Sequence, residues 1–166
     1  EYGGACYCDN CAAAFRAWLQ KRYGTLEEVN ERWYTRFWSH TFHDWQEIVP
    51  PNQLSEQWSH DRTVFPALSL DYLRFMSDSI LACYRIEYEV LKEITPNVPA
   101  TTNLMGTFKP LNYFAWAPYL DVISWDSYPS SRDAVSNIAL RHDLMRGLKG
   151  GQPFMLMEQT PSQQNW

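Results

Sequence analysis

The sequence has no run of the roughly 18–20 apolar residues that a membrane-spanning helix requires. It also has no excess of positive charge: 14 lysines and arginines stand against 19 aspartates and glutamates, a net charge of −5 at pH 7. Nucleic acids and anionic membranes are bound through clustered basic residues, so neither partner is expected. A glycine-rich phosphate loop, a serine nucleophile motif and a His-Glu-x-x-His motif are also absent from the sequence. A neutral substrate is the better expectation.

Aromatic residues are abundant in the 166 residues, with 8 Trp, 10 Tyr and 8 Phe in a sequence that is 45% hydrophobic. Such a chain can bury the core of one ordinary globular domain. Aromatic rings pack in cores and also suit the C–H-rich faces of sugars, and composition leaves both uses open. Residue 1 is not a methionine, and Trp166 follows a predicted strand and its loop. We therefore expect both ends to be cuts through a longer protein.

Two short helices are predicted near the start of the sequence. Apolar side chains three or four residues apart predict a helix over residues 11–23, and Gly24 follows as its stop. Thr25 with Glu28 three residues later is a capping-box pattern, which opens a helix that runs to about residue 33.

A longer amphipathic helix is predicted over residues 72–94, with Ser69 or Asp71 as its cap. Residues 34–68 before it show little periodicity, and long irregular segments in compact domains are usually functional or form interfaces. We expect Cys83 to be a small buried hydrophobic residue of this helix. The face predicted to contact the core is Leu73, Met76, Ile80, Cys83, Ile86, Val90 and Ile94.

The second half of the sequence alternates between strand and helix patterns. Short β-prone segments occur at residues 100–105, 121–129 and 153–158, and a helix is predicted over 131–148, ended by Gly150 and Gly151. Nearly continuous apolar strands separated by helices are typical of a parallel sheet that helices cover. The fold class is therefore α/β.

Polar residues stand where these strands end: Asn103, Asp126 with Tyr128, and Glu158. In α/β barrels the carboxyl ends of the strands carry the active site, so these residues are candidates for catalysis or binding. Glu158 follows the apolar residues 154–157, where an unpaired buried carboxylate would cost several kcal/mol. The alternative is a glutamate just beyond the strand, solvated in a loop.

Cys6, Cys8 and Cys11 lie within six positions, a spacing that favours metal ligation over a disulfide framework. Three thiolates this close can converge on one tetrahedral Zn²⁺, which prefers four nitrogen or sulfur ligands in a structural site. The sequence thus predicts a structural zinc site with one ligand missing.

Several blocks of this sequence resemble the β-galactosidases of glycoside hydrolase family 42, and they follow the family order across nearly all of the chain. That family has a (β/α)8 TIM barrel, so the resemblance implies that residues 1–166 are part of one catalytic barrel domain, from the end of strand 4 through strand 7, truncated at both ends. The similar blocks are residues 1–3, 6–11, 14–19, 21–26, 37–45, 101–106, 125–129 and 154–166.

The resemblance also implies the catalytic residues. Glu1 takes the place of the acid/base, which in the family follows an asparagine that lies outside this chain, and Glu158 takes the place of the nucleophile. A retaining double displacement needs one ionised and one protonated carboxyl, about 5–5.5 Å apart. We expect that separation for Glu1 and Glu158, and terminal β-D-galactose residues as the substrate.

Further implications concern binding. Trp166 corresponds to an aromatic residue that stacks on the sugar, and Tyr128 to a tyrosine beside the nucleophile. Trp38 is a candidate either for the pocket wall, where it would reach a neighbouring subunit's site, or for packing in the core or an interface. The fourth zinc ligand would be a cysteine before residue 1, and no organic cofactor is expected. The resemblance favours a homotrimer in the bacterial cytoplasm.

Two other classes of function remain open. A zinc-stabilised interaction module would account for the cysteines without catalysis, although it leaves the segment around Glu158 unexplained. A non-catalytic sugar-binding relative would keep Tyr128 and Trp166 but lack one of the two carboxylates.

Overall fold

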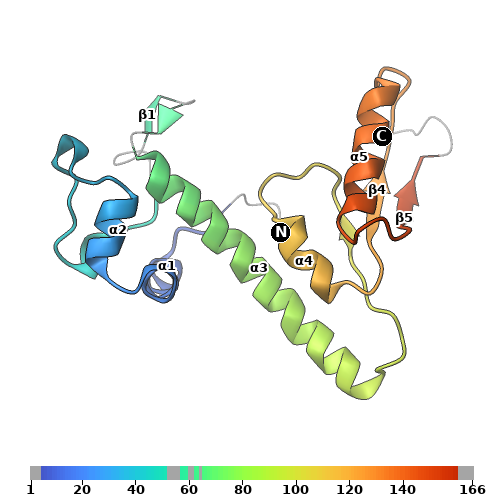
Figure 1. The fold of residues 1–166 in the computed structure, drawn as a ribbon, viewed down its shortest axis with the longest axis horizontal. Helices are drawn as coiled ribbons and strands as arrows, with labels where there is room; N and C mark the ends of the chain where they lie inside the picture. Colours follow the sequence, from blue (N-terminus) through green and yellow to red (C-terminus); the bar gives the residue numbers. More distant parts are fainter. Residues whose placement is uncertain (1–4, 52–56, 60–61, 64, 161–166) are drawn as a thin grey trace. The chain divides into compact units, whose positions relative to one another are not determined.

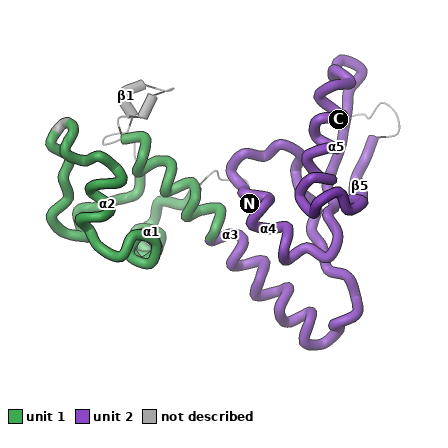
Figure 2. Tube along the Cα trace, viewed as in Figure 1, with its two compact units in different colours: residues 1–78 green, residues 79–166 purple. Residues whose placement is uncertain are grey.

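A computed structural model describes residues 5–51, 57–59, 62–63 and 65–160, without the side chains of Trp38 and of residues 57–59 and 62–63. The chain divides into two compact units, residues 1–78 and 79–166 (Figure 2). Each unit has its own cluster of buried hydrophobic side chains. The long helix α3 (Pro66–Ile94) contributes residues to both units.

Unit 1 is mainly helical. Its apolar side chains meet in one core cluster that includes Phe15, Leu19 and Tyr72. Its elements in chain order are α1 (Asp9–Tyr23), α2 (Leu26–Arg32), the 3-10 helices η1 (Phe37–Ser39) and η2 (Trp45–Glu47), the antiparallel strands β1 (Gln57–Ser59) and β2 (Arg62–Thr63), and the first part of α3 (Figure 1).

The two short helices confirm the sequence predictions. α1 ends at Tyr23, and Gly24 has a φ of 80°, a value that glycine adopts without the steric cost of a Cβ. Thr25 is the N-cap of α2, and its side-chain oxygen accepts a hydrogen bond of 3.2 Å from the backbone amide of Glu28. α1 begins at Asp9, so Cys11 lies in its first turn.

The start of the long helix was wrongly predicted. α3 begins at Pro66, a residue whose fixed φ suits the first helical position, so Ser69 and Asp71 lie inside the helix and do not cap it. Asp71 is buried, and its carboxylate accepts hydrogen bonds from the hydroxyl of Tyr23 (2.6 Å) and the indole N–H of Trp33 (2.8 Å). This acid joins α3 to the preceding helices.

The predicted core-facing side of α3 was also wrong. In unit 1 the helix buries Leu68, Tyr72 and Phe75. Apolar spacing marks a stripe on a helix, but the elements that pack against the helix decide which side is covered. Cys83 is an exposed free thiol and not a buried hydrophobic residue. Met76 is partly buried, and the other residues of the predicted face are exposed in this chain: Leu73, Ile80, Ile86, Val90 and Ile94.

The irregular segment after α2 is ordered by one side chain of that helix. The Asn30 amide donates to the carbonyl of Phe42 (2.7 Å) and accepts from the backbone amide of Phe42 (2.9 Å). The same Asn30 oxygen accepts from the hydroxyl of Thr35, which is fully buried (2.7 Å). These bonds satisfy backbone groups that have no helix or sheet partner.

Unit 2 contains the parallel sheet, and the structure confirms that prediction. The strands lie in the order β3-β4-β5, and both pairs are parallel. The elements of unit 2 after α3 are β3 (Asn103–Leu104), α4 (Tyr113–Trp116), the 3-10 helix η3 (Ala117–Tyr119), β4 (Ser124–Ser127), α5 (Val135–Gly147) and β5 (Met155–Gln159) (Figure 1).

Trp125 of β4 is the largest fully buried side chain among the described residues of unit 2. Its ring meets His142 of α5 edge to face, with ring centroids 5.1 Å apart, and Met145 of α5 lies in the same core cluster. Gly106 has a φ of 61°, and a Cβ there would come within 3.3 Å of the Trp125 ring. The close approach of the loop after β3 to this ring thus depends on glycine.

The described residues hold three parallel strands, as expected for part of an α/β barrel. Three expectations stay predictions: the complete barrel, the span from strand 4 to strand 7, and the single catalytic domain. Among the described helices, none has the length and apolar character needed to cross a bilayer.

Candidate functional site

Asp126 and Glu158 lie near the carboxyl ends of β4 and β5, which meet at one edge of the sheet because the strands are parallel. Asn103 was expected at a strand end, but it is the first residue of β3. Asp126 of β4 is the register partner of Glu158 of β5. The register shifts just before this pair: Trp125 is opposite Leu156, so Met157 is an extra residue of β5. This irregularity brings the two carboxylates opposite each other on neighbouring strands.

Glu158 is exposed, and its side chain is held by Tyr128. The hydroxyl of Tyr128 donates a hydrogen bond to Oε2 of Glu158. A hydrogen bond to a carboxylate is stronger than one between neutral groups, so this contact restricts the rotamer of Glu158. Tyr128 is 40% exposed, and both residues are accessible from solvent. The arrangement presents an oriented carboxylate at the edge of the sheet.

A second polar pair lies across the neighbouring strands. The side-chain amide nitrogen of Asn103 donates to Oδ2 of Asp126 over 2.6 Å. Asn103 is the register partner of Ser124, two residues before Asp126, so this bond runs diagonally from β3 to β4. Asp126 in turn is opposite Glu158 of β5. The sequence pattern identified these three residues but not the pairing of Asp126 with Glu158, because the extra residue of β5 leaves no mark in the apolar pattern.

Three of the predicted site residues cannot be placed. Glu1 and Trp166 lie outside the described residues. Trp38 belongs to η1, and its side chain is not described. The expected separation of Glu1 and Glu158 and the roles of both tryptophans stay predictions.

The three predicted metal ligands come together in unit 1. The sulfur atoms of Cys6, Cys8 and Cys11 all lie within 4.8 Å of one another, and those of Cys6 and Cys8 are 3.5 Å apart. Sulfurs bound at about 2.3 Å to one tetrahedral Zn²⁺ lie roughly 3.8 Å apart. The cysteines fit three vertices of such a site, and each is a free thiol.

The electrostatics of the cluster favour a cation. The backbone amide of Cys11 and the thiol of Cys6 stabilise the Cys8 thiolate and lower the pKa of Cys8. The hydrogen bond with Cys6, together with burial and Cys8, raises the pKa of Cys11 to about 12. The pKa of one thiol is thus lowered while that of its neighbour is raised. A divalent cation would remove this conflict by neutralising adjacent thiolates.

Tyr72 of α3 fixes the segment that carries the cysteines. Its hydroxyl donates to the backbone carbonyl of Cys6, and its ring stacks on Tyr7 with centroids 5.5 Å apart. Burial raises the pKa of Tyr72, so the hydroxyl remains protonated and able to donate. The backbone of the cysteine segment is therefore held by the protein itself.

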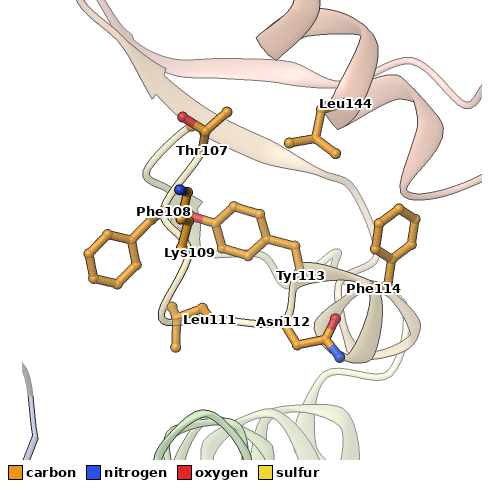
Figure 3. Close-up of a pocket in the computed structure, with 9 residues that line it drawn as sticks. Thr107, Phe108, Lys109, Leu111, Asn112, Tyr113, Phe114 and Leu144 are labelled. Atoms are coloured by element: carbon orange, nitrogen blue, oxygen red, sulfur yellow. The ribbon is translucent and has the colours of Figure 1, made fainter. Parts of the chain in front are cut away.

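A cavity of about 250 Å³ lies in unit 2, beside the segment that follows β3. Tyr113 of α4 projects into its centre, and Thr107, Phe114 and Leu144 stand around the ring (Figure 3). The Tyr113 hydroxyl accepts a hydrogen bond of 2.9 Å from the backbone amide of Met105. The lining of the cavity is mainly apolar and does not include Tyr128 or Glu158. We therefore do not assign it to the candidate site.

A family model described as beta-galactosidase, that of glycoside hydrolase family 42, matches residues 1–166. The chain belongs to this family. It is 61% identical over 166 residues to the beta-galactosidase BgaP of Planococcus sp. (strain L4), covering 100% of this chain and 25% of that protein. It is 50% identical over 162 residues to the beta-galactosidase bgaB of Geobacillus kaustophilus, covering 97% of this chain and 23% of that protein.

Solved structures agree with the family assignment. A crystal structure of beta-galactosidase from Bacillus circulans sp. alkalophilus matches with a TM-score of 0.93 and 62% identity, covering 100% of this chain and 25% of that one. The beta-galactosidase from Rahnella sp. R3 matches with a TM-score of 0.88 and 44% identity, covering 100% of this chain and 24% of that one. The chain spans about a quarter of the length of the relatives it matches.

Proposed function

We propose that this chain is a segment of a retaining β-galactosidase that hydrolyses terminal non-reducing β-D-galactose residues of β-galactosides, with Glu158 as nucleophile and Glu1 as acid/base. One observation carries the proposal: Glu158 lies at the carboxyl edge of a parallel sheet with its Oε2 held by Tyr128. The membership of family 42 supports the same reaction and substrate.

The geometry around Glu158 suits a nucleophile. Its Oε2 accepts from Tyr128, whereas Oε1 has no hydrogen-bond partner among the described residues. A carboxylate held through one oxygen can attack through the other without first losing a protein contact. The exposed position gives a sugar access to that oxygen.

The proposed reaction has two displacements. The Glu158 carboxylate bonds to the anomeric carbon while the glycosidic C–O bond breaks, and the leaving oxygen takes the proton of Glu1. Water then gives a proton to the Glu1 carboxylate, and its oxygen bonds to the anomeric carbon. This second step releases galactose and restores the Glu158 carboxylate. Two inversions at one carbon give net retention.

The remaining roles also belong to the proposal. Trp166 would stack against the galactose ring, and Trp38 would form part of a pocket wall, at a neighbouring subunit's site in a trimer. Cys6, Cys8 and Cys11 would hold a structural Zn²⁺ with a fourth cysteine outside this chain. Bound there, the metal would cross-link the cysteine segment and α1 to another part of the protein. The homotrimer and the cytoplasmic location stay predictions.

The test of the proposed function is hydrolysis of an aryl β-galactoside by the full-length protein. Release of the aryl alcohol with β-galactose as the first sugar product, detected by NMR before mutarotation, is expected. An inactive full-length protein that still binds zinc would favour the interaction module. An inactive protein that binds galactose would favour the sugar-binding relative.

Tyr128→Phe should lower kcat about 10- to 100-fold and change KM much less, because the hydroxyl orients Glu158 and the ring is kept. Steady-state kinetics on an aryl β-galactoside measures both constants. Tyr119→Phe is the matched control: its ring contacts Arg85 and Tyr88, and these contacts survive the substitution. Equal activity of Tyr128→Phe and the wild type would remove Tyr128 from the proposed mechanism.

Cys8→Ser should abolish stoichiometric zinc binding by the full-length protein and lower its melting temperature by about 5–10 °C, because a structural metal adds its binding free energy to folding. Metal content per chain and thermal unfolding are the measurements. Cys83→Ser is the matched control, since Cys83 is also an exposed free thiol and does not belong to the cluster. One bound zinc in purified Cys8→Ser would contradict the proposed ligand set.

A further inference from the structure

The pair Asn103 and Asp126 has no role in the proposed mechanism, although it lies beside Glu158 on the sheet. The Asn103 amide donates to Oδ2 of Asp126 over 2.6 Å, and Asp126 is opposite Glu158 on the neighbouring strand. Adjacent strands are about 4.8 Å apart, and Asn103 is opposite Ser124, two residues or about 6.6 Å before Asp126, so the backbones of Asn103 and Glu158 are separated by roughly 12 Å. A sugar bound at Glu158 has the dimensions to reach both residues.

Asp126 depends strongly on this contact. Its other oxygen, Oδ1, is buried and has no hydrogen-bond partner among the described residues. A buried carboxylate oxygen without a partner is costly, and the bond from Asn103 to the other oxygen is the hydrogen bond that the described side chains provide to Asp126. A pair with this cost requires an explanation beyond simple packing.

The chemistry of the pair decides which way the Asn103 amide points. The Asn103 side-chain nitrogen faces Oδ2 of Asp126 and donates to it, because a carboxylate oxygen accepts hydrogen bonds. Its carbonyl oxygen then points away from Asp126. Asn103 is exposed, so this oxygen is an acceptor of fixed orientation that a ligand can reach. Sugar hydroxyls are donors that suit such an acceptor.

We propose that Asn103 accepts a hydrogen bond from a hydroxyl group of the galactosyl unit, and that Asp126 is a positioning residue that fixes the orientation of the Asn103 amide. This inference rests on the proposed function. It makes Asn103 a residue that determines which sugars react, because a sugar without the matching hydroxyl leaves the oriented carbonyl unpaired.

The test compares aryl β-galactosides that each lack one hydroxyl group, using the full-length wild type and Asn103→Ala. In the wild type, loss of the partner hydroxyl should lower kcat/KM about 10- to 100-fold. Asn103→Ala should lower kcat/KM for the parent substrate by a similar factor. For the one deoxy substrate that lacks the partner hydroxyl, the same substitution should change kcat/KM by less than about threefold.

Asp126→Asn tests whether Asp126 acts by orienting the Asn103 amide, which contacts the sugar. This nearly isosteric change lets the Asn103 amide bond in either orientation, so kcat/KM should fall about 3- to 10-fold, again with the smallest effect on the same deoxy substrate. Asn137→Ala is the matched control, because Asn137 is an exposed asparagine of α5. The wild-type comparison requires no variant, so it can still overturn the inference if Asn103→Ala does not fold, and Asp126→Asn then carries the comparison between substrates.

The outcomes separate this inference from the proposed function. A wild-type protein that does not hydrolyse the parent substrate would overturn both. An active wild type in which Asn103→Ala has no effect, or affects every deoxy substrate equally, would overturn the role of Asn103 alone. The same holds if the wild type reacts equally fast with all of the deoxy substrates.

Discussion

Glu158→Gln in the full-length protein should lower kcat on an aryl β-galactoside by at least about a thousandfold, because an amide cannot form the glycosyl-enzyme intermediate. The effect on folding should be small. Glu158 is exposed, and the carbonyl oxygen of glutamine can still accept the hydrogen bond from Tyr128. The measurement is steady-state kinetics together with a melting curve that shows an intact fold.

Glu158→Gly gives a sharper version of this experiment. Removal of the carboxylate leaves space on the face of the sugar opposite the leaving group, where azide can attack an activated aryl galactoside. The product should be the α-galactosyl azide, because only one inversion occurs. In Glu1→Gly, azide should instead attack the galactosyl-enzyme and give the β-galactosyl azide. NMR of the products thus assigns the two roles independently.

The matched control for Glu158 is Glu93→Gln, since Glu93 is an exposed glutamate of α3 that takes no part in the proposed site. It should keep the wild-type kcat. Glu158→Gln with more than about a tenth of wild-type activity would exclude Glu158 as the nucleophile. An α product from Glu1→Gly would exclude Glu1 as the acid/base even if Glu158 is correctly assigned.

Asp71→Ala should destabilise the protein by about 3–5 kcal/mol, because it removes the acceptor of a buried network. Asp71 is 1% exposed, and its carboxylate accepts from Tyr23, Trp33 and Arg74 at 2.6, 2.8 and 2.9 Å. Without the carboxylate, the hydroxyl and the indole N–H lose their partner away from water. Equilibrium unfolding in urea measures the loss.

Asp78→Ala is a close control for this prediction. Asp78 is on the same helix and also accepts from an indole N–H, that of Trp18 at 2.9 Å, but it is exposed. Water can replace an exposed hydrogen bond, so the loss should stay below about 1 kcal/mol. Equal destabilisation by the two substitutions would show that burial does not determine the contribution of Asp71.

Local signals in the sequence were enough for much of the secondary structure. Thr25 caps α2 as predicted, Gly24 follows the end of α1, and the strand-helix-strand pattern of the second half forms a parallel sheet. Such signals act between residues a few positions apart, and a sequence displays them directly. The spacing of Cys6, Cys8 and Cys11 is also a local signal, because a few residues of backbone bring the three sulfur atoms together.

The errors on α3 have a different origin. Ser69 and Asp71 look like caps, yet Asp71 is held by Tyr23 and Trp33, which are 48 and 38 residues away along the chain. Likewise, Cys83 has the spacing of a core residue and is exposed, because no described neighbour covers that side of the helix. Periodicity describes one helix, whereas burial depends on the segments that pack against it.

The sequence by itself determined the family, the α/β class, the cysteine cluster and Glu158 as the candidate nucleophile. Only the tertiary structure decided that an extra residue in β5 places Glu158 opposite Asp126, that Tyr128 holds its Oε2, and that Asn103 is oriented by Asp126. Motifs and capping depend on neighbours in the chain. Strand register and side-chain pairing depend on contacts between residues more than twenty positions apart, and these form only when the sheet assembles.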